Sequence, residues 1–131
     1  MTIGRPGGRR KRGRLSRSGD FDRVYREGSS HANRYLVLYT FPRSADRLDD
    51  DEIRLGISVS RKVGGAVARN AVKRALRESF WSLSPGGGGR HDVVLVARPD
   101  VAGLVARAGT QGVAEALGAL LTQAGLVGGT V

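Results

Sequence analysis

Residues 55–83 of this 131-residue chain, LGISVSRKVGGAVARNAVKRALRESFWSL, encode a strand followed by a helix. Apolar and small residues alternate from Leu55 to Ser60, a period of two that is typical of a strand with one apolar face. The pair Gly64-Gly65 interrupts the alternation. From Ala66 to Leu83 the apolar residues recur at helical spacing, so we expect a helix there.

This predicted helix and the residues that lead into it are strongly basic. Between Gly56 and Arg77 the charged residues are all cationic: Arg61, Lys62, Arg69, Lys73, Arg74 and Arg77. Like charges at positions i and i+4 repel and destabilise an isolated helix by about 0.3 kcal/mol per pair. A polyanion lying along this face would remove the repulsion, and the alternative is a solvated basic surface without a partner.

The composition of the whole chain favours the polyanion. The net charge is +10 and the sequence pI is about 11.3, as expected for a protein with a nucleic-acid partner, although charge alone does not exclude an anionic membrane surface.

The chain has no cysteine, so it has neither a disulfide framework nor a thiolate zinc site. No apolar run approaches the ~20 residues that span a bilayer, and the first residues lack the apolar core of a secretory signal. We therefore expect a cytoplasmic protein with no membrane partner.

Two segments carry a family resemblance. GISVSRKVG at residues 56–64 and AVARNAVKRALRE at residues 66–78 resemble the signature of the protein subunit of bacterial ribonuclease P, which trims the 5′ leader from precursor tRNA. The hallmark of that family is an Arg-Asn-Arg triplet on a helix. Here the triplet is Arg69-Asn70-Ala71, so the third position departs from the family pattern, and Lys73 or Arg74 would have to replace its contact.

The resemblance implies a ribonucleoprotein enzyme in which the RNA subunit performs the hydrolysis with Mg²⁺. The protein would bind no metal, supply no catalytic side chain, and have two partners, the ribonuclease P RNA and precursor tRNA, with no obvious protein partner. The residues that would contact the catalytic RNA are Ser60, Arg61, Lys62, Arg69, Asn70, Lys73, Arg74 and Arg77.

An aromatic pair lies on a second predicted helix, Arg17–Glu27. Phe21 and Tyr25 are spaced i, i+4, which is typical of a core-facing pair, yet such rings also stack on unpaired bases at about 1–3 kcal/mol each. We expect at least one of the two to be only partly buried. The resemblance implies that Phe21, Val37, Tyr39 and Ser58 form the floor of a cleft for the leader, with Tyr25 at its edge.

Two other functional interpretations stay open at this point. Asp46, Asp49, Asp50, Asp51 and Glu52 could hold Mg²⁺ for a protein-only nuclease, but consecutive acids in a short link are more typical of a solvated hairpin loop. His31 and His91 each stand alone, with no partner at metal-ligand spacing. The remaining alternative is a plain RNA-binding or ribosome-associated protein without turnover.

The other elements complete an α/β fold. Arg34–Phe41 and Val93–Arg98 are apolar enough to be strands, and Thr110–Leu126 has the stripe of a last helix, which gives the order α-β-β-α-β-α. We expect a basic arm at residues 1–14, a polar link at residues 29–33, and one RNA-binding domain at residues 15–131: a small mixed sheet with a βαβ crossover and three helices, an α+β sandwich. The resemblance implies that the crossover is left-handed and that a further short strand exists.

Overall fold

The computed structural model describes residues 12–14, 18–42, 53–83 and 91–126. The elements follow in chain order as β1 (Arg12–Arg14), α1 (Ser18–Glu27), β2 (Ser29–Ala32), β3 (Leu36–Pro42), β4 (Ile53–Val59), α2 (Ala66–Ser82), β5 (His91–Ala97) and α3 (Val101–Gln123). The predicted order of three helices and three principal strands is therefore confirmed, with each of those strands shifted by two residues at its start and by one at its end.

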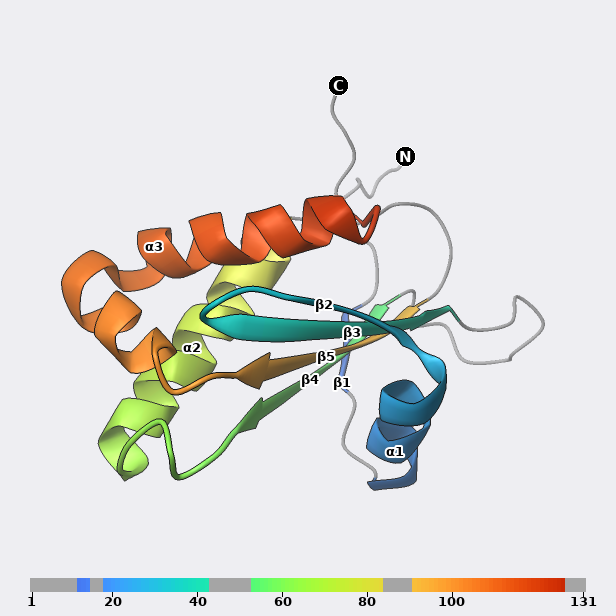
Figure 1. Ribbon diagram of the computed structural model, residues 1–131, viewed down its shortest axis with the longest axis horizontal. Coiled ribbons are helices and arrows are strands. Elements are labelled where there is room, and N and C mark those ends of the chain that lie inside the picture. The colour runs from blue at the N-terminus through green and yellow to red at the C-terminus, as the bar shows by residue number, and fades with distance from the viewer. Residues whose placement is uncertain (1–11, 15–17, 43–52, 84–90, 127–131) are drawn as a thin grey trace, which may run out of the picture.

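A mixed sheet forms the centre of the fold (Figure 1). Within the described residues it has five strands in the order β1-β4-β5-β3-β2. The pairs β1–β4 and β4–β5 are parallel, whereas β5–β3 and β3–β2 are antiparallel. Because β4 and β5 are parallel neighbours, the segment β4–α2–β5 is the predicted βαβ unit.

Helices cover both faces of this sheet, α2 and α3 on one face and α1 on the other (Figure 1). The main core lies on the α2–α3 face, where Leu36 and Leu38 of β3 and Leu55 and Val59 of β4 are buried. A smaller cluster on the opposite face centres on Val24 of α1, which packs against Val94 of β5. Successive side chains of β3 and β4 point to opposite faces of the sheet, so the fold has a large core on the α2–α3 face and a small one on the α1 face.

The turn between β4 and α2 depends on Gly64. Its φ of 155° lies in a region that L side chains rarely adopt, and a Cβ atom there would approach the Cβ of Ala68 to 2.9 Å. The backbone N–H of Val63 donates to Ser60 O at 3.1 Å, and that of Gly64 donates to Arg61 O at 3.2 Å. These bonds hold Ser60, Arg61 and Lys62 directly before the first turn of α2.

Three predicted boundaries need correction. The segment 29–33 was expected to be a link, but Ser29–Ala32 forms β2, because the edge of β3 offers unpaired backbone groups that a polar strand can bond equally well. Likewise Arg12–Arg14 pairs with β4 as β1, so the predicted basic arm ends before Arg12; its residues 1–11 lie outside the described part. The last helix begins at Val101 rather than at Thr110, with a break at Gly109 (φ 62°, ψ −156°) that obscures its periodicity.

Candidate nucleic-acid interface

The residues predicted to contact RNA share one helix and the turn before it, and we call them the basic face: Ser60, Arg61, Lys62, Arg69, Asn70, Lys73, Arg74 and Arg77. The first three lie in the turn before α2, and the others lie on α2 itself. Arg69 and Lys73 are half-buried, while the remaining six are exposed. The opposite side of α2 is buried through Val72, Ala75, Leu76, Ser79 and Phe80, so packing against the core fixes the direction in which the cations point.

The cations of the basic face have no acidic partner within the described residues. The ion pairs found there join Arg23 and Arg54 to Asp92, and Arg34 to Asp100, all outside this face. In addition, Nε of Arg69 is buried without a hydrogen-bond partner in the described part of the chain. The exposed cations around it, Arg61, Lys62, Arg74 and Arg77, are accessible and suit an external acceptor such as phosphate.

The beginning of α2 adds backbone donors to the same surface. Gly65 is the N-cap residue and supplies no side-chain hydrogen bond to the first turn, which also lacks an acidic residue. The N–H groups of a helix's first turn have no intrahelical partner, and the helix dipole favours negative charge there. With Arg61 and Lys62 exposed next to it, this end of α2 is chemically suited to an anion.

A second surface lies on the α1 side of the sheet and contains Phe21, Tyr25, Val37, Tyr39 and Ser58, which we call the aromatic face. Strand register brings its sheet residues together: Val37 pairs with Val96, which pairs with Ser58, while Tyr39 pairs with Val94. Directly paired residues point to the same side of a sheet, so these side chains form adjacent rows. Val37, Tyr39, Ser58 and Val96 are all half-buried rather than sealed.

Helix α1 covers only part of the aromatic face. Tyr25 reaches from α1 to Tyr39, with ring centroids 4.9 Å apart in an edge-to-face arrangement, and keeps 38% of its surface exposed. Phe21, one turn away, is half-buried. The expectation that at least one of this pair is partly exposed is therefore confirmed. Burial raises the pKa of the Tyr25 phenol, an effect that a hydrogen bond with Ser58 partly offsets.

A buried carboxylate that the sequence analysis did not single out anchors α1 to this face. Asp92 of β5 is fully buried; it accepts from Arg23 of α1 at 2.6 Å and twice from Arg54 of β4 at 2.8 Å. The guanidinium of Arg23 also lies 5.2 Å from the ring centroid of Phe41. The sequence did contain a signal: a charged residue stands next to apolar strand residues in both places, Arg54 between Ile53 and Leu55, and Asp92 before five apolar residues.

The structure brings together no alternative catalytic site within its described residues. The acidic segment 46–52 lies outside them, and among the residues that are described no three His, Asp or Glu side chains cluster as metal ligands would. His31 and His91 lie on different strands, β2 and β5. None of the described helices combines the length and the apolar character needed to cross a membrane.

Comparison with known protein families gives one clear match. The family model described as Ribonuclease P matches residues 10–125. A ribonuclease P protein component from Halalkalibacterium halodurans is 42% identical over 93 residues, covering 71% of this chain and 75% of the relative. The corresponding protein of Bacillus velezensis is 47% identical over 93 residues, covering 68% of this chain and 72% of the relative.

Solved structures agree in fold. The RNase P protein of Staphylococcus aureus superposes with a TM-score of 0.74 at 35% identity and covers 88% of this chain and 97% of its own. The RNase P protein of Thermotoga maritima gives a TM-score of 0.71 at 33% identity, covering 84% of this chain and 96% of its own. The similarity therefore extends over both surfaces described above.

Proposed function

The chain belongs to the ribonuclease P protein family, and from that premise we propose that its basic face binds the RNA subunit while its aromatic face receives the 5′ leader of precursor tRNA. Its function is that of the protein component of a ribonucleoprotein endoribonuclease in 5′ maturation of tRNA. In this enzyme the hydrolysis is carried by the RNA and not by protein side chains, and we assign the Mg²⁺ to the RNA as well.

The observation that carries this assignment is that the cations of the basic face have no acidic partner among the residues that the structure describes. Six cations, four of them exposed and two half-buried, lie on one helix and its entry turn: Arg61, Lys62, Arg69, Lys73, Arg74 and Arg77. Keeping like charges this close costs free energy in the isolated protein, and a phosphate backbone recovers it by releasing condensed counterions. A helix presented in this way contacts phosphates along a folded RNA without reading base sequence.

The aromatic face suits a different part of the substrate. Its rings and small side chains lie beside one another on the far side of the sheet from α2, and Tyr25 and Tyr39 keep part of their surface accessible. Unpaired bases stack on such rings without strong sequence preference. Contact with the leader on one face and with the RNA subunit on the other would allow the protein to hold both at once.

Location in the cytoplasm, expected from the sequence, stays a prediction.

One reconstitution tests the function. The protein is mixed with ribonuclease P RNA and precursor tRNA at low Mg²⁺ concentration, and release of the leader is followed over time. We expect faster leader removal than with the RNA alone. Tight RNA binding without any acceleration would instead favour a ribosome-associated or purely structural RNA-binding protein, and cleavage by the protein alone would favour a protein nuclease built on residues 46–52.

A double substitution, Arg69→Ala with Arg74→Ala, separates RNA contact from folding. We expect weaker binding of the RNA subunit and a nearly unchanged melting temperature, because neither side chain has a partner within the described part of the protein. Arg107→Ala is the control for the loss of one arginine outside the basic face, since Arg107 is exposed on α3 and already donates to the Tyr35 hydroxyl at 2.8 Å. A large loss of stability in the double variant would mean that these arginines support the fold rather than the RNA.

A further inference from the structure

Val67, the second residue of α2, is the most exposed large apolar side chain in the described part of the protein. It keeps 85% of its surface exposed, and among the described residues Tyr25 is the other large hydrophobic residue that is exposed. Tyr25 belongs to the aromatic face. The two large hydrophobic side chains that the described structure leaves in water therefore lie one beside each surface assigned to RNA.

Folding does not account for a valine at this position. A side chain so exposed adds little to the core, and the β-branched valine has a lower helix propensity than the alanines on either side of it, Ala66 and Ala68. Single apolar residues are common on protein surfaces, so the surroundings of Val67, and not its exposure alone, have to indicate a partner.

Val67 lies between cations along the helix axis. The turn before α2 presents Arg61 and Lys62, both exposed. On the helix, residues three, four and seven positions further on share the side of Val67. The residues at these positions, all exposed, are Asn70, Ala71 and Arg74. At a rise of 1.5 Å per residue Arg74 lies about 10 Å along the axis from Val67, so the apolar patch of Val67 and Ala71 has cations at both ends.

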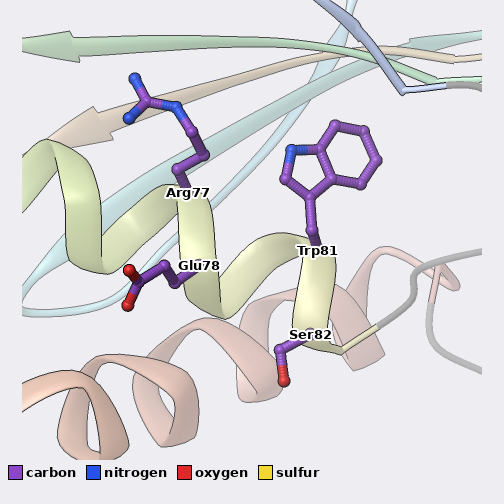
Figure 2. Close-up of a pocket in the computed structure, with 4 residues that line it drawn as sticks. All are labelled: Arg77, Glu78, Trp81 and Ser82. Carbon is purple, nitrogen blue, oxygen red and sulfur yellow. The ribbon is translucent and has the colours of Figure 1, made fainter.

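The other end of α2 is less suited to a polyanion. Glu78 is the first acidic residue of the helix, and it lines a shallow hollow with Arg77, Trp81 and Ser82 (Figure 2). In Figure 2 Arg77 and Trp81 project from one side of the helix and Glu78 and Ser82 from another, so the four do not surround a single ligand. The acid-free part of α2 therefore ends before Glu78, and Val67 lies at its N-terminal end.

The cations around the apolar patch indicate a nucleic acid as its occupant. When Arg61, Lys62 and Arg74 bind phosphates, the sugars and base edges of the same RNA lie over Val67. The minor groove of an A-form RNA helix is wide and shallow and displays these groups together with 2′-hydroxyls. The amide of Asn70, beside the patch, donates to or accepts from such a hydroxyl. A second copy of this chain would bring a further net charge of +10 to the same surface and is disfavoured.

We propose that Val67 contacts the sugar and base-edge carbons of the RNA subunit, between phosphates bound by the entry turn and by Arg74. This inference rests on the proposed function and adds to it an apolar contact, whereas the basic face was assigned contacts to phosphates. Burial of one methyl group strengthens binding by about 4-fold, so covering both methyl groups of Val67 contributes about 15-fold. No counterion is released when this side chain is covered, and its contribution is therefore independent of salt.

Two substitutions of Val67 test the contact, with Arg74→Ala for comparison. Filter binding measures the affinity for ribonuclease P RNA at several salt concentrations. Val67→Ala should weaken binding about 4- to 15-fold at every salt concentration without changing the slope of log K against log salt, whereas Arg74→Ala should reduce that slope by about 0.7. Val67→Thr keeps the β-branched shape but replaces one methyl group by a hydroxyl, and it should lose about 4-fold. Alanine has the higher helix propensity, so the melting temperature of Val67→Ala should not fall.

Wild-type affinity in either Val67 variant would overturn this proposal and leave the proposed function standing, because the wild-type protein would still bind the RNA and accelerate leader removal. A shallower slope in Val67→Ala would also overturn it, since the substitution would then act through the neighbouring cations. Two other occupants give results of their own: an equal loss of affinity for precursor tRNA without the RNA subunit, or dimerisation of the free protein that Val67→Ala abolishes. Either would overturn the assignment to the RNA subunit, whereas absence of RNA binding by the wild type would remove the proposed function itself.

Discussion

Ala71 shows how one residue can limit the strength of the basic face. It is exposed on α2 between the assigned contacts Asn70 and Lys73, and it stands where the resembling family has arginine. Alanine and arginine have similar helix propensities, so Ala71→Arg adds a charge at a cost of only about 0.3 kcal/mol, from repulsion with Arg74 three residues on. We expect tighter binding of the RNA subunit and a salt dependence steeper by about 0.7 in log K against log salt, as one more neutralised phosphate gives.

The control for that substitution is Ala71→Gln, which adds a polar side chain without charge. Filter-binding titrations at several salt concentrations compare both variants with the wild type, and thermal unfolding confirms that the fold is kept. An equal gain from glutamine and arginine would show that contact area rather than charge limits the affinity. No gain from arginine would place this position away from the RNA.

Tyr25 permits a pH experiment on the aromatic face. Burial raises the pKa of its phenol above the ordinary value of 10.0, so the folded protein retains this proton at a pH where the unfolded chain has lost it. The sign of the pH effect follows from linkage. Because the pKa is higher in the folded state, the contribution of Tyr25 to the free energy of unfolding is complete below the unfolded-state pKa and is lost as pH rises through the folded-state pKa. Phenolate absorbance should therefore show one tyrosine ionising late, and Tyr25→Phe should abolish that late phase; a titration of the wild type without it would contradict the burial.

At the scale of elements, the position of α1 depends on the buried cluster of Arg23, Arg54 and Asp92. Removing one member of a buried ion pair leaves an uncompensated charge and typically costs about 3–5 kcal/mol. Asp92→Asn should therefore lower the free energy of unfolding by about 3 kcal/mol, measured by urea denaturation. The leader should also bind more weakly, because α1 carries Phe21 and Tyr25.

Asp100→Asn is the matched control for the prediction at Asp92. Asp100 accepts from Arg34 at a similar distance, 2.8 Å, but both side chains are largely exposed, and Asp100 makes no side-chain capping bond to α3. The free energy of unfolding should then be nearly unchanged. If the two variants are equally stable, the cluster at Asp92 does not hold α1 in place.

Sequence patterns predicted the elements whose packing is local and periodic. The helix after Gly64-Gly65 and the strands around Leu36, Leu55 and Leu95 follow from spacing alone, because each buries an apolar face. Edge strands β1 and β2 are held by backbone hydrogen bonds, which any side chain allows, so Arg12–Arg14 and Ser29–Ala32 carried no signal. The hand of the β4–α2–β5 crossover stays a prediction, since hydrophobic patterning is the same for either hand.

The functional residues likewise fall into a group that the sequence predicted and a group that it did not. The basic face was predictable because its residues share one helix and its entry turn. The row of Val37, Val96 and Ser58 depends on register between three strands, and Val96 was not foreseen. The cluster at Asp92 joins three elements far apart in the chain, and such long-range pairing leaves no periodic pattern in the sequence.

At the scale of the whole molecule, the fold separates two kinds of contact. The sheet places the α2 basic face and the α1 aromatic face on opposite sides (Figure 1). Phosphate contacts on one side depend on counterion release, whereas stacking on the other depends on ring area and responds little to salt. Salt should therefore weaken binding of the RNA subunit more steeply than it weakens contact with the leader.

That difference leads to a quantitative prediction for the complete protein. If the cations of the basic face neutralise about five phosphates, log K for the RNA subunit should fall against log salt with a slope of about −3 to −4. Replacing both Arg69 and Arg74 by alanine should reduce the slope by about 1.4, whereas Arg107→Ala should leave it unchanged. Binding isotherms at several salt concentrations measure all three slopes. A wild-type slope near zero would mean that the net charge of +10 does not act through phosphate contacts. If the Arg107 variant, which loses one charge, shows half the reduction of the double variant, which loses two, charge acts through the general field of the protein rather than through this helix.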